Sequence, residues 1–412
     1  MYTITHNAKL TKLCAITHSQ RCSMSLLKDF SLSSLTAGFV AVLVGYTSSA
    51  VIIFQAAAAA GASQAEVTSW FFALGIGMGL STLGLSLYYK TPILTAWSTP
   101  GAALLVTSLP GLSMAEAIGA FIFCGALITL AGITGWFERL MKFLPQELAT
   151  AMLAGVLLQF GLAAFHSAET HLILVISMFA LYLLGKRFFP RYAILMVLFG
   201  SVALVYLMGE LQLDRLSFEL ATPIMTLPSF SLTALIGVGI PLFIVTMASQ
   251  NMPGIAVIKA SGYLPPLSPI ITWTGITTLL LAPLGAFALN LAAITAAICM
   301  SEEAHPDKQR RYTAAVAASI FYILSGLLAA SVATLMFAFP QALVLTLAGL
   351  ALLSTIGNSL SVALANPDGR EAALITFLAT ASGMTLFGIG SAFWGLLAGV
   401  LAWHLMRKPS IK

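Results

Sequence analysis

Five long intervals of the chain contain no Asp, Glu, Lys or Arg, and they restrict the folds that it can adopt. The intervals run from Phe30 to Gln64, Leu220 to Ile258, Ala260 to Ser301, Tyr312 to Pro367 and Ala372 to Met406. Because about 20 apolar residues cross a bilayer, several intervals must contain two crossings. Hydrophobic residues make up 59% of the chain and charged residues 8%, which no soluble domain of this length would tolerate. The sequence therefore predicts an all-α polytopic membrane protein.

Hydropathy and turn signals predict about fourteen transmembrane segments in two groups of seven. The first seven cover 32–55, 66–88, 92–108, 115–135, 146–165, 170–185 and 192–209, and the second seven cover 232–250, 267–283, 284–300, 312–337, 340–362, 371–386 and 388–406. An odd number of spans in each half makes the second half enter the membrane with the opposite orientation. We therefore predict a 7+7 inverted repeat, with residues 31–209 and 232–406 as its halves.

Basic residues test this count, because cytoplasmic loops of membrane proteins carry an excess of Lys and Arg. With the N-terminus inside, every second connection is basic, and the acidic loop 209–231 falls outside. The basic connections include Lys90, Arg139, Lys186, Lys259, Lys308 and Arg370. This pattern predicts two cytoplasmic termini, with residues 1–30 as a cytoplasmic extension. The net charge of +5 then reflects basic loops and not a nucleic-acid partner.

A polar interruption, Thr95-Ala96-Trp97-Ser98-Thr99-Pro100-Gly101, stands inside a stretch without charges from Thr91 to Ala115. Backbone groups that lack a helical partner are tolerated at membrane depth only where they are buried in protein or line a cavity. Ser98 or Thr99 is suited to cap a helix that has Pro100 at its first position, where a missing N–H costs nothing. The pattern predicts a short strand followed by a helix, as in the broken spans of transporters.

The second half repeats this pattern weakly at the corresponding position, the tenth span. Residues 283–289 precede Asn290, which can cap a following helix of small residues. Two helix N-termini would then face one another near the midplane of the membrane, each with roughly +0.5 of a charge from its dipole. Such a place suits an anion, and it holds a carboxylate without Arg or Lys.

Polar and aromatic side chains in neighbouring spans are candidates for the lining of this site. Trp97, Phe287 and Tyr46 can present ring faces to a flat apolar body, although Trp97 and Phe287 can equally pack the short strands. Tyr46 and Ser49 are three residues apart and share a helix face. The group Ser249-Gln250-Asn251 is the densest uncharged polar cluster in any span. Its position favours the site over the alternative, hydrogen bonds between helices.

No predicted span carries a carboxylate near its middle, so no side chain is an evident proton carrier. Glu66 and Glu116 are interpreted as charges at helix N-termini. The loop 301–308 is interpreted as a charged turn, since its His and acidic residues lack the spacing of metal ligands. We expect no metal, no cofactor and free thiols at the four cysteines. The lack of a nucleophile paired with a base argues against an enzyme.

Seven strings of residues along the chain carry a family resemblance. They are Leu94-Thr-Ala-Trp-Ser-Thr-Pro-Gly-Ala-Ala-Leu104, Val245-Thr-Met-Ala-Ser-Gln-Asn251, Pro253-Gly-Ile-Ala256, Ala292-Ala-Ile-Thr-Ala-Ala-Ile-Cys299, Glu303-Ala-His-Pro-Asp-Lys308, Ala348-Gly-Leu-Ala-Leu-Leu-Ser-Thr-Ile-Gly357 and Gly388-Ile-Gly-Ser-Ala-Phe-Trp-Gly395. Together they resemble the benzoate:proton symporter family of the BenE type. The resemblance extends from about Ser34 to the end, and the first thirty or so residues look unlike the family.

The resemblance implies an inner-membrane importer of an aromatic carboxylate, with the fold shared by uracil transporters and sulfate permeases. In that fold the substrate lies between the broken third and tenth spans. A core domain (32–135 and 232–337) packs beside a gate domain (146–209 and 340–406), and the gate often forms a homodimer. The implied site comprises Trp97, Ser98, Thr99, Pro100, Gly101, Leu289, Asn290 and Leu291, lined by Tyr46, Ser49, Ser249, Gln250 and Asn251.

One departure affects the proton. Nucleobase carriers of this wider fold use a glutamate in the eighth span, where this chain has Ser249-Gln250-Asn251, so their coupling route does not transfer. The predicted function is import of benzoate or a related aromatic carboxylate with a proton, by alternating access of core against gate. The nearest alternative is an anion exchanger or nucleobase carrier on the same fold. A channel is a further alternative that saturable uptake would exclude.

Overall fold

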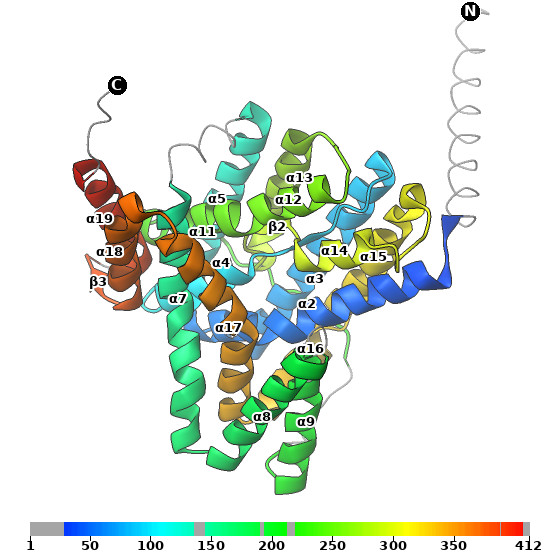
Figure 1. Ribbon diagram of the computed structural model, residues 1–412, viewed down its shortest axis with the longest axis horizontal. Coiled ribbons are helices and arrows are strands. Elements are labelled where there is room, and N and C mark those ends of the chain that lie inside the picture. Colours follow the sequence, from blue (N-terminus) through cyan, green and yellow to red (C-terminus); the bar gives the residue numbers. More distant parts are fainter. Residues whose placement is uncertain (1–28, 136–144, 190–192, 212–218, 388, 407–412) are drawn as a thin grey trace, which may run out of the picture.

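A computed structural model describes residues 29–135, 145–189, 193–211, 219–387 and 389–406 as a helical protein with two short β-ribbons (Figure 1). The longer helices are α2 (Leu32–Ala59), α3 (Gln64–Tyr89), α5 (Met114–Thr134), α7 (Gln146–His166), α8 (Leu172–Phe188), α9 (Ala193–Met208), α13 (Leu267–Leu281), α15 (Tyr312–Leu327), α17 (Gln341–Leu364), α18 (Arg370–Ala381) and α19 (Ser391–Met406). Residues 1–28 of the predicted extension 1–30, together with the basic residues Arg139 and Lys412, lie outside the described residues.

Shorter elements fill the places where the sequence is broken. They are β1 (Thr95–Trp97) with α4 (Thr99–Ser108), β2 (Leu289–Leu291) with α14 (Ile294–Met300), α16 (Ala329–Ala338), and the ribbon of β3 (Thr385–Leu386) with β4 (Ile389–Gly390). The strands β1 and β2 form one antiparallel ribbon although they come from opposite halves of the sequence. Each of the fourteen predicted segments contains at least one helix.

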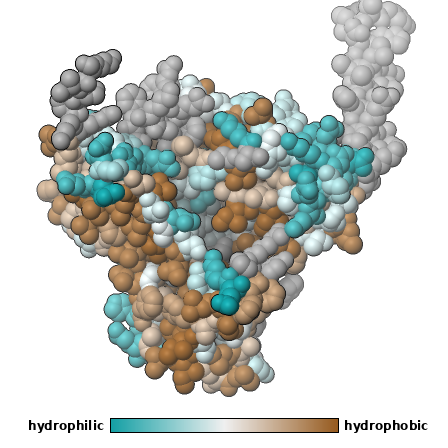
Figure 2. Space-filling model, in the orientation of Figure 1, coloured by the Kyte–Doolittle hydropathy of each residue, from teal (hydrophilic) through white to brown (hydrophobic). Residues whose placement is uncertain are grey.

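Seven helical stretches of the described chain are long and apolar enough to cross a membrane. They are Leu32–Ala59, Gln64–Tyr89, Met114–Thr134, Gln146–Glu169, Leu232–Lys259, Leu267–Leu284 and Gln341–Leu364. Ala193–Met208 and Ser391–Met406 are shorter apolar helices. Apolar side chains also cover much of the molecular face in Figure 2, and Leu172, Ile173 and Ile176 at the start of α8 are exposed. A lipid environment accounts for such a surface, since soluble monomers rarely expose large apolar patches.

The eighth and eleventh segments differ from the single helices expected, the eighth in where it ends and the eleventh in its continuity. The eighth was predicted to end at residue 250, but helix continues from Leu232 to Ala260 through α10 (Leu232–Ala234), η4 (Leu235–Gly239), α11 (Ile240–Thr246), η5 (Met247–Asn251) and α12 (Met252–Ala260). The pieces η4 and η5 are π-helical. This wider winding keeps the backbone helical through the polar residues Ser249, Gln250 and Asn251. The eleventh segment is two helices, α15 and α16, separated at Leu328.

The helices fall into two groups by their packing. The helices α2, α3, α5, α13 and α15 pack on one another, and α7, α8, α17, α18 and α19 form a second group. Figure 1 shows β2 among the first group, while α7 and α17 of the second extend away from it. The two groups also touch, since α2 contacts α17, and the short helix α4 contacts α7.

Capping at the N-termini of α3 and α5 follows the local sequence. Ser63 and Glu66 form a reciprocal capping box at α3, and Ser113 and Glu116 form one at α5. Each pair satisfies two backbone N–H groups that the first helical turn leaves open. The interpretation of Glu66 and Glu116 as charges at helix N-termini is therefore confirmed.

Close packing of α3 on α15 depends on glycine. A Cβ added at Gly75 would lie 2.6 Å from the Gly326 Cα and 2.7 Å from the Gly326 nitrogen, whereas a Cβ at Gly84 of the same helix would meet nothing within 4 Å. Because backbone atoms cannot move aside as a flexible side chain can, residue 75 has no room for a larger side chain.

We expect Gly75→Ala to lower the free energy of unfolding by about 1–3 kcal/mol through overpacking. Gly84→Ala is the matched control, and it should be neutral or stabilising by up to about 1 kcal/mol, since alanine favours helix. Thermal unfolding of the two variants in the same detergent measures the difference. Equal melting temperatures would contradict the close contact at Gly75.

Candidate functional site

The ribbon of β1 and β2 lies at the centre of the first helix group and joins the two halves of the chain. Ala96 is opposite Asn290, and Trp97 is opposite Leu289. The pairing extends past both strands, because the Ser98 N–H donates to the Ala288 carbonyl at 3.0 Å and the Ala292 N–H donates to the Leu94 carbonyl at 2.9 Å. The prediction of extended backbone at the third and tenth segments is thus correct for these residues.

The outer edges of the ribbon are closed by threonine side chains from the preceding helices. The Thr95 N–H donates to the Thr82 hydroxyl oxygen of α3 at 2.9 Å, and the Leu289 N–H donates to the Thr278 hydroxyl oxygen of α13 at 3.0 Å. Each threonine lies in the helix before the strand that it supports. The two halves therefore satisfy equivalent backbone groups in the same way, and a buried N–H without a partner is avoided.

The remaining outward N–H groups use less usual acceptors. The Trp97 N–H points to the Met78 sulfur at 3.2 Å, and the Leu291 N–H donates to the Asn251 amide oxygen at 2.9 Å. The Asn251 amide nitrogen points to the Met247 sulfur at 3.1 Å, and the residue is fully buried. Asn251, predicted to line the site, therefore supports strand β2.

The N-terminus of α4 follows the predicted pattern, except that Thr99 and not Pro100 is its first residue. Ser98 is the N-cap, and its hydroxyl accepts a hydrogen bond from the Gly101 N–H at 3.1 Å, with Pro100 in the first turn. The Thr246 hydroxyl of α11 donates to the same Ser98 oxygen at 2.9 Å. A Cβ at Gly101 would lie 2.7 Å from both the Ser98 oxygen and the Leu242 side chain, so glycine permits this close turn.

The predicted cap at the start of α14 is wrong. Asn290 lies in the middle of β2, and α14 begins at Ile294 after Ala293, which provides no side-chain cap. Ribbon pairing continues to Ala292, so the helix starts later than the local sequence suggested. Placed with its oxygen toward Ser98, the Asn290 amide accepts from the Ser98 N–H at 3.0 Å and donates to the Leu291 carbonyl at 2.9 Å.

Tyr46 and Trp97 form an aromatic pair beside β1. Their rings meet edge to face with centroids 4.7 Å apart, and the Trp97 indole N–H donates to the Ser49 hydroxyl at 2.8 Å. The Tyr46 hydroxyl is buried beside the Ser325 side chain. Trp97 is 4% exposed. The structure therefore brings together Tyr46, Ser49 and Trp97, as predicted from the sequence.

Phe287 has a different environment. It is fully buried, and its ring centroid lies 6.1 Å from that of Trp70 and 6.0 Å from that of Phe121. This is the packing role that the sequence left open for it. Leu289 and Leu291, on either side of Asn290, are also fully buried.

The three residues of the eighth-segment polar cluster differ in their burial. Ser249 and Gln250 are half-buried, whereas Asn251 is enclosed. The Ser249 oxygen is buried without a hydrogen-bond partner. Thr99, the first residue of α4, is also half-buried. Ser249 and Thr99 are therefore better placed than Asn251 to meet a ligand.

Several residues important to the ribbon were not predicted, namely Met78, Thr82, Thr246 and Thr278. Their only local signal is a polar or polarisable side chain in a charge-free span. Most such hydroxyls bond to their own helix, as the Thr274 hydroxyl does to the Ile271 carbonyl, so the signal does not separate the two roles.

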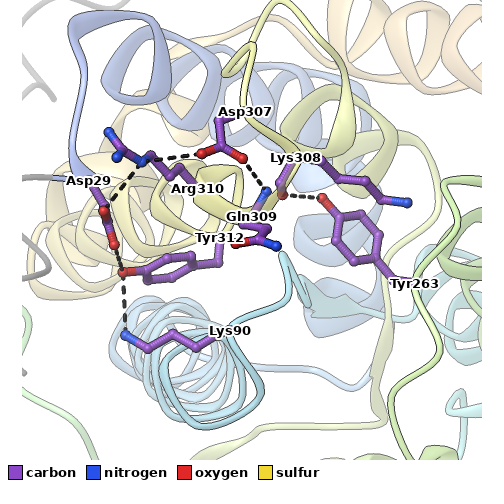
Figure 3. A pocket seen from close by; sticks show the side chains of 8 residues that line it. All are labelled: Asp29, Lys90, Tyr263, Asp307, Lys308, Gln309, Arg310 and Tyr312. Carbon is purple, nitrogen blue, oxygen red and sulfur yellow. Dashed lines mark hydrogen bonds and ion pairs between the residues drawn. The ribbon is translucent and has the colours of Figure 1, made fainter.

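A second polar region, the terminal pocket, lies where α2, α3 and α15 have adjacent ends (Figure 3). It encloses about 630 Å³ and is lined by Asp29, Lys90, Tyr263, Asp307, Lys308, Gln309, Arg310 and Tyr312. Burial raises the pKa of the Tyr263 phenol, so it stays protonated at neutral pH and donates to the Lys308 carbonyl at 2.8 Å.

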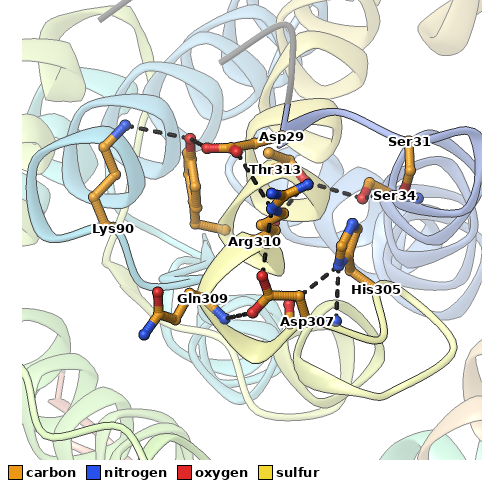
Figure 4. Close-up of polar contacts among 10 residues, drawn as sticks. Asp29, Ser31, Ser34, Lys90, His305, Asp307, Gln309, Arg310 and Thr313 are labelled. Atoms are coloured by element: carbon orange, nitrogen blue, oxygen red, sulfur yellow. Dashed lines mark hydrogen bonds and ion pairs between the residues drawn. The ribbon is translucent and has the colours of Figure 1, made fainter. Parts of the chain in front are cut away.

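Ionic and phenolic contacts cross the terminal pocket (Figure 4). Tyr312 donates to Asp29 at 2.8 Å, and Lys90 donates to the Tyr312 oxygen at 3.3 Å. Arg310 lies 3.5 Å from Asp29 and 3.3 Å from Asp307. Among the described residues no group of three His, Cys, Asp or Glu side chains forms a metal site. The network joins helix ends, in agreement with a charged turn at 301–308.

The chain as a whole matches known membrane proteins. A family model described as "Benzoate membrane transport protein" (BenE) matches residues 28–405. Inner membrane protein YdcO of Escherichia coli (strain K12) is 53% identical over 374 residues, which is 91% of this chain and 96% of that protein. The benzoate membrane transport protein of Acinetobacter baylyi is 42% identical over 385 residues, 93% of this chain and 98% of that protein.

Solved structures share the fold at low sequence identity. The murine Solute Carrier 26 family member A9 anion transporter, in an inward-facing state, has a TM-score of 0.58 and 13% identity, over 93% of this chain and 70% of that chain. The transmembrane domain of a cyanobacterium bicarbonate transporter, BicA, has a TM-score of 0.54 and 13% identity, over 90% and 98%. The fold is a mostly helical membrane transporter fold, and the expectation of a transporter rather than an enzyme is confirmed.

We expect Thr278→Val to lower the free energy of unfolding by about 1–3 kcal/mol, because the buried Leu289 N–H loses its acceptor. Thr274→Val is the matched control on the same helix, since the Thr274 hydroxyl bonds only to its own helix carbonyl. Melting temperatures of both variants in detergent, with expression levels as a check, test the difference. If Thr274→Val is as harmful as Thr278→Val, the strand bond is not the cause.

Proposed function

We propose that this chain, which belongs to the BenE family of benzoate membrane transport proteins, imports benzoate or a related aromatic carboxylate by proton symport. One observation carries the proposal. The β1–β2 ribbon holds the capped N-terminus of α4 beside the Tyr46–Trp97 aromatic pair. A helix N-terminus, which is suited to an anion, therefore lies next to aromatic rings. An aromatic carboxylate contains these two parts, a charge and a flat apolar body.

The charge of the substrate is met by dipoles. No Asp, Glu, Lys or Arg occurs from Thr91 to Ala115 or from Ala260 to Ser301, so both broken segments lack formal charge. The N-terminus of α4 supplies a partial positive charge. The Ser249 oxygen is buried without a partner, and its hydroxyl is suited to donate to a carboxylate. Thr99 and Gln250 complete the proposed polar lining, and Ser49 holds the Trp97 ring.

The proposed architecture has fourteen spans in a 7+7 inverted repeat, with a core (32–135 and 232–337) that moves against a gate (146–209 and 340–406). The separate packing of the two helix groups supports this division. The matched Thr82 and Thr278 bonds to strands β1 and β2 support the repeat. We also propose a homodimer through the gate and two cytoplasmic termini in the inner membrane, on the basis of the family resemblance and the alternation of basic loops.

Uptake of radiolabelled benzoate by proteoliposomes tests substrate and coupling together. With an inward proton gradient the label should accumulate above its external concentration, and a protonophore should reduce it to equilibrium, because the proton gradient supplies the driving force. Empty liposomes measure passive entry of the neutral acid. Accumulation that survives the protonophore and requires anion inside the vesicles would favour the exchanger, and uptake without saturation would favour a channel.

We expect Ser249→Ala to raise the KM for benzoate about tenfold, because a hydrogen bond to a charged carboxylate contributes about 1.5–3 kcal/mol. Ser319→Ala is the matched control, since that buried hydroxyl bonds to the Val316 carbonyl of its own helix. Initial rates over a range of benzoate concentrations separate KM from Vmax. An unchanged KM in Ser249→Ala would show that Ser249 does not bind the substrate. It would leave the description of the β1–β2 ribbon unchanged.

A further inference from the structure

The eighth-segment helix touches both halves of the ribbon through two buried side chains. The Thr246 hydroxyl donates to the Ser98 oxygen at 2.9 Å, at the cap of α4. The Asn251 amide oxygen accepts from the Leu291 N–H at 2.9 Å, at the end of β2. Both side chains are fully buried. One helix therefore holds a residue of the first half and a residue of the second half.

This arrangement is not available to a regular α-helix. Side chains five residues apart on an α-helix are separated by about 140° around the axis, so Thr246 and Asn251 would point to different sides. In the structure the intervening turn, η5, is π-helical, and the Met252 N–H bonds to the Met247 carbonyl five residues back. A π turn takes more residues per revolution, which turns position 251 back toward the side of position 246.

We propose that Thr246 is a positioning residue of the substrate site, and that the π turn Met247–Asn251 allows one helix to fix α4 and β2 together. Thr246 sets the orientation of Ser98, which holds the first turn of α4 through the Gly101 N–H at 3.1 Å. Asn251 fixes the position of β2 by accepting from the Leu291 N–H. The helix thereby fixes the distance between the cap of α4 and strand β2. It affects substrate affinity without contacting the substrate.

The same turn also carries the half-buried residues Ser249 and Gln250. The π winding thus serves two purposes, since positions 246 and 251 face the ribbon while 249 and 250 are left for other contacts. A purely structural role for Thr246 would lower stability alone. A positioning role predicts a change in affinity that serine at the same position reverses, because serine restores the hydroxyl donor.

The transport test uses Thr246→Val, which keeps the shape and removes the donor, and it rests on the proposed function. We expect the benzoate KM of Thr246→Val to rise about fivefold to tenfold with Vmax changed less, as the loss of one hydrogen bond implies. Thr246→Ser should return the KM to within about twofold of the native protein. Thr274→Val, whose hydroxyl bonds only within its own helix, should leave the KM unchanged.

A second measurement does not depend on any substrate. Amide hydrogen exchange in detergent should be faster for the peptide that contains the first turn of α4 in Thr246→Val than in the native protein or in Thr274→Val. Failure of the native protein to take up benzoate would overturn the proposed function and leave this measurement to decide the inference. Unchanged exchange at α4, or a Thr246→Ser variant as impaired in KM as Thr246→Val, would overturn the positioning role.

Discussion

The structure depends on the satisfaction of the backbone N–H groups of β1 and β2. A two-stranded ribbon has two open edges, and because the strands are buried within the protein, no bulk water is available to close them. Here the inner edges pair with each other, and the outer N–H groups bond to Thr82, Thr278, Asn251 and the Met78 sulfur. Each acceptor lies on a helix that must pack directly against the ribbon, so the strand bonds also determine where α3, α13 and η5 lie.

This requirement changes the interpretation of polar residues in the spans. A polar side chain inside a charge-free helix suggests a ligand, yet Asn251 and Asn290 serve the backbone of the ribbon. Ser98 is occupied by the cap of α4 and by Thr246. The buried Ser249 oxygen has no hydrogen-bond partner. The residues that remain for a substrate are therefore fewer than the polar residues that surround the site.

Much of the fold could be predicted from the sequence because its signals are local. Charge-free intervals located the helices, and Ser98-Thr99-Pro100-Gly101 located the start of α4. The errors arose where a distant partner decides the structure. Asn290 has the residue type of a helix cap, but it pairs with Ala96 in the ribbon. The eighth helix continues past residue 250 because its polar cluster lies in a π-helical turn. Thr246 and Thr278 could not be told from other buried threonines, since their partners lie in remote segments.

The lack of charge around the ribbon bears on the choice between symport and movement of the anion alone. With only dipoles to offset it, a carboxylate bound without a proton at the proposed site would carry one net negative charge across the membrane. Entry of that charge into a cell works against the membrane potential by about 2.3 kcal/mol per 100 mV. A proton that travels with the carboxylate removes this cost, and it needs no buried acidic side chain if the substrate itself carries the proton. A site without a carboxylate of its own is thus compatible with the proposed proton symport, because the carboxylate of the proposed substrate can itself accept the proton that crosses with it.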